Sequence, residues 1–173
     1  MERRVALRNM ALSIGVMAGL PAWASGWTKD SLNKGTWLAA DQSRVLLAVV
    51  ETIIPKTDTP GAGELGVDKF VQKMVTDCYD KKTQAGLASG ISNLDELSIS
   101  TFGKSFTEAS GVQKLQLLKD VEKSADEESK ALFSLVKNLT IQGYMNSEYV
   151  MTNITHYEMI PARYHGCVPV KKG

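Results

Sequence analysis

Residues 40–79 read ADQSRVLLAVVETIIPKTDTPGAGELGVDKFVQKMVTDCY, and this stretch decides the fold. Its first third carries apolar side chains on more than one side of a helix, which is typical of a helix inside a core. Pro55 ends that helix because proline lacks an N–H group and biases Ile54 away from the helical conformation. A second helix begins near Val67, where apolar residues recur at steps of three and four. Residues 55–62, here called the elbow, have turn chemistry and join the two helices.

The second helix is predicted to be amphipathic with a single buried face. Polar residues stand at the positions between the apolar ones. The predicted face consists of Val67, Phe70, Val71, Met74, Val75, Cys78 and Tyr79.

Three further helices are predicted after a charged break at residues 80–82. The first has an apolar stripe that consists of Leu87, Ile91, Leu94 and Leu97. A loop or a pair of short turns over residues 98–109 follows, held to the core by Phe102 and Phe106. The remaining two helices begin at predicted capping boxes over residues 110–113 and 124–127.

The last of these helices is expected to stop at Gly143, since glycine is a common residue just after a helix. From His156 onward, prolines and glycines rule out long regular structure. No stretch alternates in the manner of a strand over a useful length. The predicted fold class is all-α: about five helices in one compact domain, with an N-terminal signal segment and an irregular C-terminal arm.

The elbow and the two ends of the predicted domain carry motifs of a known family. Residues 51–55 (ETIIP), residues 57–62 (TDTPGA) and Gly66-Val67 with Phe70 resemble the opening of gluconate 2-dehydrogenase subunit 3. Residues 160–169 (IPARYHGCVP) resemble the closing segment of that family, which usually has glycine where Ala162 stands. The resemblance covers most of the chain after residue 36.

Members of this family accompany a large FAD-dependent dehydrogenase of sugars or sugar acids, and often a cytochrome c subunit. The resemblance therefore implies no cofactor on this chain, FAD on a partner subunit, and haem c where a cytochrome is present. It also implies a non-catalytic role. The residues by themselves leave open whether the chain is an enzyme.

The first 24 residues have the three parts of an export signal. A basic region with three arginines precedes an apolar region over residues 10–20. A small-x-small cleavage site follows, at Ala22 and Ala24. A membrane-spanning anchor would need about 20 apolar residues, more than this stretch offers.

The signal is similar to a twin-arginine signal, and general secretion is the alternative. The matching residues are Arg3, Arg4, Leu7 and Arg8. Ala6 departs from the pattern, because an aromatic residue is usual there. We therefore expect a twin-arginine-type signal at 1–24, a linker at 25–40 and a helical small-subunit domain at 41–173, located in the periplasm.

Charge excludes some classes of partner. The chain has 20 Lys and Arg against 19 Asp and Glu, and the first 24 residues hold three of the arginines and one glutamate. The part after the signal thus has 17 against 18, a net charge of −1. Such a balance does not indicate binding to nucleic acid or to an anionic membrane surface.

The residues show little that indicates catalysis. There is no Cys-x-x-Cys-His haem motif, no dinucleotide fingerprint and no phosphate-binding loop. The two histidines, His156 and His165, lack the spacing of a helical metal pair. Glu51 and Asp58 beside the elbow are the carboxylates of most interest, although capping of the turn backbone is the simpler interpretation. A free-standing enzyme or a haem- or metal-binding domain built on these four residues is the alternative function, and a purely structural exported domain is a third.

The two cysteines, Cys78 and Cys167, form an even pair in a chain expected to reach an oxidising compartment. An internal disulfide would close a loop of roughly 90 residues and hold the C-terminal arm on the helices. The alternatives are a buried Cys78 with an exposed Cys167, or a bond from Cys167 to a partner subunit.

The predicted function is that of a small subunit that stabilises a flavoprotein and carries it through twin-arginine export. Its partner surface is predicted on the C-terminal arm, because that segment is too irregular to bury its aromatic and apolar residues in a helix bundle. The predicted interface consists of Tyr157, Met159, Ile160, Arg163, Tyr164 and Val168.

Overall fold

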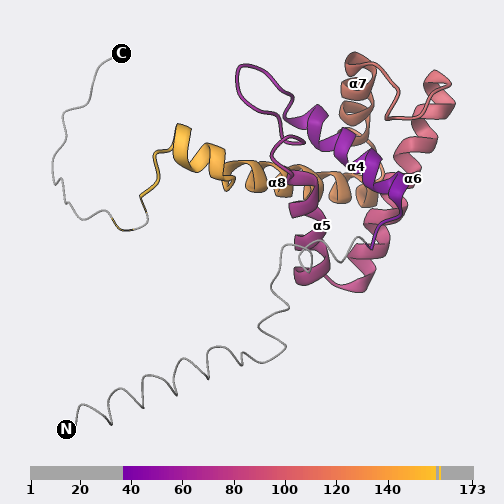
Figure 1. The fold of residues 1–173 in the computed structure, drawn as a ribbon. Helices are drawn as coiled ribbons and strands as arrows, with labels where there is room; N and C mark the ends of the chain where they lie inside the picture. Colours follow the sequence, from indigo (N-terminus) through magenta and orange to yellow (C-terminus); the bar gives the residue numbers. More distant parts are fainter. Residues whose placement is uncertain (1–36, 159, 161–173) are drawn as a thin grey trace, which may run out of the picture. The chain divides into compact units, whose positions relative to one another are not determined.

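A computed structural model describes residues 37–158 and 160 of the chain. Within these residues there are five α-helices, one short π-helical segment and no β-strand (Figure 1). In chain order they are α4 (Ala40–Ile53), α5 (Val67–Cys78), α6 (Lys81–Phe102), α7 (Gly111–Glu122), α8 (Glu127–Met145) and the π-helical η1 (Val150–Ile154). The predicted all-α class with about five helices is confirmed. No helix in this part of the chain has the length and apolar character that crossing a bilayer requires.

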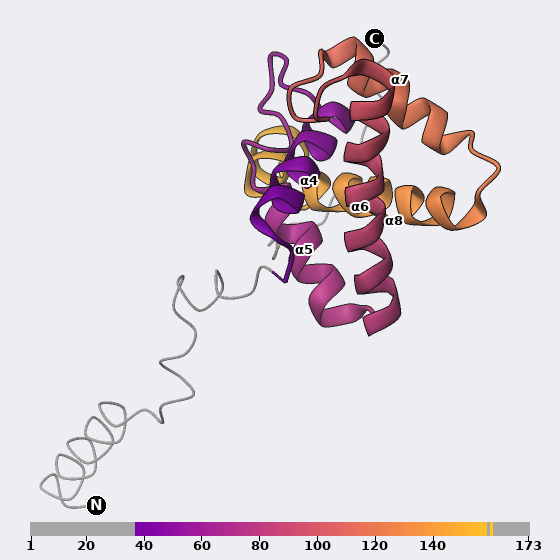
Figure 2. The same ribbon diagram turned by 90° about the vertical axis from the view of Figure 1, so that its right-hand side faces the viewer.

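The first helix, α4, contacts all four other α-helices, and Figure 2 shows it next to α5 and α8. Its buried residues are Val45, Leu46, Ala48, Val49 and Val50. The prediction of an internal helix that ends before Pro55 is therefore confirmed. The buried part begins slightly before the predicted linker ends, since Leu38 is already buried.

The second helix, α5, buries a narrower face than the sequence predicted. Val67, Val71 and Val75 are almost completely buried, and Gln72 is buried beside them. The predicted extension of this face to Cys78 and Tyr79 is wrong, because both residues are exposed. The physical reason is that α5 ends at Cys78 and the backbone turns to an extended conformation at Tyr79, beyond the reach of the core.

The third helix, α6, is longer than predicted at both ends. The expected charged break is only the N-cap, because the Asp80 carboxylate accepts a hydrogen bond from the backbone N–H of Thr83 at 3.0 Å. The predicted loop over residues 98–109 is wrong for its first part, since the helix continues to Phe102 and ends at Gly103 with a positive φ of 69°. Phe106 is fully buried, as the sequence predicted.

The caps of α7 and α8 test two predictions of the same kind. At α7 the capping box is confirmed: the backbone N–H of Ser110 donates to Gln113 Oε1 at 3.0 Å, and that of Gln113 to Ser110 Oγ at 3.4 Å. At α8 the predicted box is wrong, because Asp126 is the N-cap and accepts from the N–H groups of Glu128 and Ser129. The hydroxyl of Ser124 accepts instead from the backbone N–H of Asp126.

Gly143 does not stop α8, which continues to Met145. It is buried against α5, and a Cβ atom built on it would lie 2.6 Å from Phe70 Cδ1 and 3.0 Å from Val67 Cγ1. Glycine stands there because it lets two helices approach closely.

Candidate interaction surface

Several predicted site residues lie outside the described residues. They are the signal residues Arg3, Arg4, Leu7 and Arg8, the cleavage residues Ala22 and Ala24, and Met159, Arg163, Tyr164, His165, Cys167 and Val168. Of the predicted interface, Tyr157 is 57% exposed and Ile160 is 82% exposed. Both side chains are therefore accessible to a partner.

Exposed apolar residues are frequent on the last turns of α8 and in the segment after it. Ile141 and Met145 lie four residues apart on α8, and Ile154 lies at the end of η1. Figure 1 shows this part of the chain, in orange and yellow, extending beyond the other helices. We call the set the C-terminal patch; it consists of Ile141, Met145, Ile154, Tyr157 and Ile160.

The segment that carries this patch is ordered by a few contacts. Val150, in the first turn of η1, is almost fully buried. The backbone N–H of Tyr157 donates to the carbonyl of Met151 at 2.8 Å. The start of the arm is therefore held on η1 while its large side chains remain exposed.

Tyr144 connects the elbow to the end of α8. Its hydroxyl donates to the carbonyl of Pro60 at 3.1 Å and lies 3.3 Å from the hydroxyl oxygen of Thr59. Tyr144 lies three residues after Ile141 and directly before Met145, so the elbow borders the C-terminal patch.

The elbow is well defined although Pro55 to Asp58 are exposed. The N–H of Ala62 donates to the carbonyl of Ile54 at 3.0 Å, and the N–H of Thr57 to the carbonyl of Thr59 at 3.1 Å. Gly61 is required by space, since a Cβ there would lie 2.8 Å from the backbone nitrogen of Lys56. These contacts fix the backbone of an exposed loop.

A salt bridge closes the base of the elbow. Lys56 Nζ lies 2.6 Å from Glu64 Oε1, and both side chains are substantially exposed. The hydrogen bond from Lys56 holds the pKa of the Glu64 carboxyl below its usual value. Exposed pairs of this kind contribute little stability.

Glu51 and Asp58, the carboxylates singled out in the sequence, are both exposed. The side chain of Glu51 lies over Gly63, where a Cβ would overlap its carboxylate. Within the described residues, the turn backbone bonds through the threonines; for example, the N–H of Thr59 lies 3.5 Å from Thr57 Oγ1. Glu51, on α4, and Asp58, in the elbow, thus both lie at the surface.

His156 lies at the surface just after η1. Its φ is +49°, and Nδ1 lies 3.1 Å from the carbonyl of Thr152. No group of three or more potential metal-ligating side chains occurs within residues 37–158 and 160. Cys78 is exposed as well, so its thiol is accessible to a reagent.

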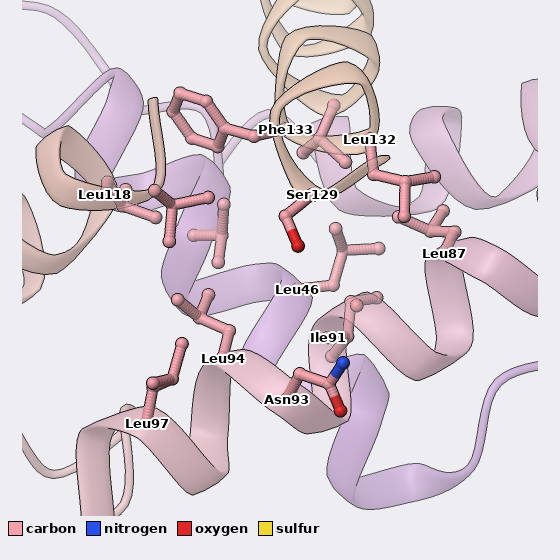
Figure 3. A pocket seen from close by; sticks show the side chains of 14 residues that line it. Leu46, Leu87, Ile91, Asn93, Leu94, Leu97, Leu118, Ser129, Leu132 and Phe133 are labelled. Carbon is pink, nitrogen blue, oxygen red and sulfur yellow. The ribbon is translucent and has the colours of Figure 1, made fainter. Parts of the chain in front are cut away.

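An apolar pocket opens between α4, α6, α7 and α8 (Figure 3). Leu46 and Leu87 are fully buried residues of its wall, Leu97 is half exposed, and Asn93 and Ser129 supply its polar side chains. Its volume is about 70 Å³, well below the roughly 300 Å³ at which ligand sites usually begin. The pocket therefore fits an aliphatic group of a few carbons.

The sequence did not single out Tyr144, Ile141, Met145 or Ile154. The sequence does contain evidence for two of them, because Ile141 and Met145 fall outside the apolar stripe of α8 that contains Val136 and Leu139. The hydrogen bonds of Tyr144 join residues more than 80 positions apart and leave no local pattern.

The fold and this surface define an all-helical domain with exposed apolar residues at the end of α8 and beyond it. The sequence model of gluconate 2-dehydrogenase subunit 3 matches residues 40–162, and the chain belongs to this family. It is therefore a subunit of a gluconate 2-dehydrogenase-type complex. No match was found among curated proteins or among solved structures.

Proposed function

We propose that this chain is the non-catalytic small subunit of a periplasmic FAD-dependent sugar or sugar-acid dehydrogenase. In this proposal it stabilises the flavoprotein subunit and carries it through twin-arginine export. Family membership supports the role of a subunit. The observation that carries the proposal is the C-terminal patch, because a surface with several exposed large apolar residues marks a site of protein association.

The proposed export role is supported by the order of the segments along the chain. A signal similar to the twin-arginine type precedes a helical domain of ordinary size with its own core. The route that this signal resembles carries folded cargo, and a flavoprotein loaded with FAD in the cytoplasm is such a cargo. FAD, and haem c where a cytochrome is present, would reside on the partner subunits at the periplasmic face of the inner membrane.

Replacement of Arg3 and Arg4 with lysine tests the export role. We expect both this subunit and its flavoprotein to remain in the cytoplasm, since the charge is kept while the recognised pair is lost. The matched control is Arg44→Lys, at a side chain that is 74% exposed on α4. Cell fractionation with flavin fluorescence gives the location of the complex, and normal export of the double variant would contradict the twin-arginine assignment.

Co-purification tests the subunit role separately. We expect the tagged subunit to isolate a yellow complex that oxidises a sugar or a sugar acid. The same chain expressed alone should show neither that activity nor a Soret band. A subunit that always purifies alone, or that shows either property by itself, would contradict the proposal.

A further inference from the structure

We propose that the apolar pocket between α4, α6, α7 and α8 is a binding site for the end of an uncharged aliphatic chain, such as that of an alkyl alcohol. The pocket shares no residue with the C-terminal patch. The inference is therefore independent of the proposed function.

The pocket lies between two helices that are consecutive in the chain but have little direct packing. In the described part of the chain, α6 packs on α4, α5 and α8, while α7 packs on α4 and α8. Leu94 of α6 and Leu118 of α7 therefore line a common space, to which Leu46 of α4 also contributes (Figure 3). A cavity of about 15 Å³ already holds one water, and cores contain few larger voids. A space of about 70 Å³ is thus large for a core of this kind.

Gly90 keeps the pocket open on the side of α6. It lies inside the helix and its φ is not positive, so the backbone does not require glycine there. A Cβ at Gly90 would meet only Leu132 Cδ1, at 3.4 Å, so close packing does not require glycine either. Glycine inside a helix is unfavourable compared with larger residues. Its effect here is to leave space beside Leu132, and that space belongs to the pocket.

The wall of the pocket favours an apolar occupant. Apart from Gly90, Asn93 and Ser129, every residue that lines it has an aliphatic or aromatic side chain. Ordered water needs two to four polar partners, which the buried part around Leu46 and Leu87 does not offer. An aliphatic group leaves water there and gains dispersion contacts. An apolar cavity of about 150 Å³ binds benzene, so a space of about half that volume accepts a group of a few carbons.

The polar side chains of the pocket favour an uncharged group at the head of the aliphatic chain. Asn93 is exposed, and its amide makes no hydrogen bond within the described residues. The hydroxyl of Ser129 points from α8 into the pocket and donates to the Asp126 carboxylate, so its oxygen can accept from a ligand (Figure 3). The acidic residues 126–128 precede Ser129 and disfavour an anionic head group. A hydroxyl group suits both Asn93 and Ser129.

Titration of the ¹⁵N-labelled full-length subunit with a series of alcohols, followed by NMR, tests the pocket. We expect 1-butanol to shift the amide signals of the residues that line it. Affinity should rise by about fourfold for each methylene added from ethanol to 1-butanol, the gain from burying one methylene. It should level off for longer alcohols, because the pocket is then full. Butanoate, which has the same number of carbons and a negative charge, should bind more weakly than 1-butanol.

Gly90→Leu fills the pocket from α6, and we expect it to abolish binding of 1-butanol without lowering Tm. The matched control is Gly86→Leu, one turn earlier on α6, which is also next to Leu132 but does not line the pocket. It should bind 1-butanol as the wild type does.

Asn93→Ala changes an exposed residue, so it gives a second test that does not depend on whether Gly90→Leu folds. Its affinity for 1-butanol should fall by about two- to tenfold, the loss typical of a neutral hydrogen bond. Its affinity for xenon, an apolar atom that forms no hydrogen bond, should stay unchanged. A change that acted only through stability would affect both ligands alike.

Vesicles of phosphatidylcholine distinguish two sources of the aliphatic chain. A change of the same amide signals with vesicles, absent in Gly90→Leu, would assign the acyl chain of a lipid. A change with soluble alcohols alone would assign a free molecule. The inference is overturned if saturating 1-butanol leaves the pocket signals unchanged or shifts mainly those of the C-terminal patch. It is also overturned if Gly90→Leu binds 1-butanol as tightly as the wild type. None of these results bears on the proposed function, which co-purification tests.

Discussion

Replacing Gly143 and Gly86 with alanine makes the same chemical change at two helical glycines with different surroundings. At Gly86, on α6, the new Cβ would lie 3.5 Å from Leu132 Cδ2, an ordinary contact. At Gly143 it would lie 2.6 Å from Phe70 Cδ1, which is closer than carbon atoms can approach. The pair therefore separates the helix propensity of alanine from the effect of overpacking.

The expected changes in the free energy of unfolding have opposite signs for the two variants. Alanine in place of glycine stabilises a helix interior by up to about 1 kcal/mol. This is the expected gain for Gly86→Ala. Overpacking of a well-packed contact costs about 1–3 kcal/mol. After the gain in helix propensity is subtracted, Gly143→Ala should be less stable than the wild type by up to about 2 kcal/mol. At roughly 4 °C for each kcal/mol, the two melting temperatures should move in opposite directions and differ by several degrees.

Thermal and urea unfolding followed by circular dichroism give the measurement, with the m-value confirming that both variants unfold in the same manner. Equal stabilisation of both variants would refute the reasoning. It would mean that the ring of Phe70 moves aside without cost and that Gly143 is not required by the packing of α5 against α8.

Two further predictions concern the cap of α8 and the two cysteines. Asp126→Ala should lower the urea midpoint of unfolding, and Ser124→Ala should lower it clearly less, because Asp126 caps α8. Hydrogen bonds from Ser129 and from the backbone lower the pKa of Asp126 in the folded protein. The stability that the Asp126 cap contributes is therefore fully present above about pH 4, and it is lost as the pH falls through the lowered pKa. The gap between wild type and Asp126→Ala in urea midpoint should therefore narrow in acid. Mass spectrometry of the exported protein without reduction should find Cys78 and Cys167 joined, and alkylation of both cysteines would dismiss the internal disulfide.

The sequence predicted those parts of the fold whose signals are local. The apolar pattern of α4, its end before Pro55 and the cap at Ser110 depend on residues within a few positions of each other. The cap of α8 was misassigned because Ser124 and Asp126 are both good N-cap residues only two positions apart. The role of Gly143 could not be predicted, because glycine ends helices and also permits close packing, and only the position of α5 decides between them.

Some residues of the interaction surface could likewise be predicted from the sequence, and others could not. The exposure of Tyr157 and Ile160 could be predicted, because prolines and glycines keep the arm irregular. The part of the surface on α8 could not, since whether Ile141 and Met145 are covered depends on where α5 and the elbow lie. The same holds for Tyr144, whose partners are distant in sequence.

Two departures from ordinary folding rules meet at one end of α8. The helix buries Val136 and Leu139 on one side and exposes Ile141 and Met145 on another, which does not favour a domain that remains alone in solution. The elbow orders an exposed loop, which costs conformational entropy that burial of Pro55–Asp58 does not offset. Departures from local consistency are expected where a protein carries its function. Since the hydrogen bonds of Tyr144 bring both departures together, one cause accounts for them more simply than two. We infer that this cause is the binding of a partner protein.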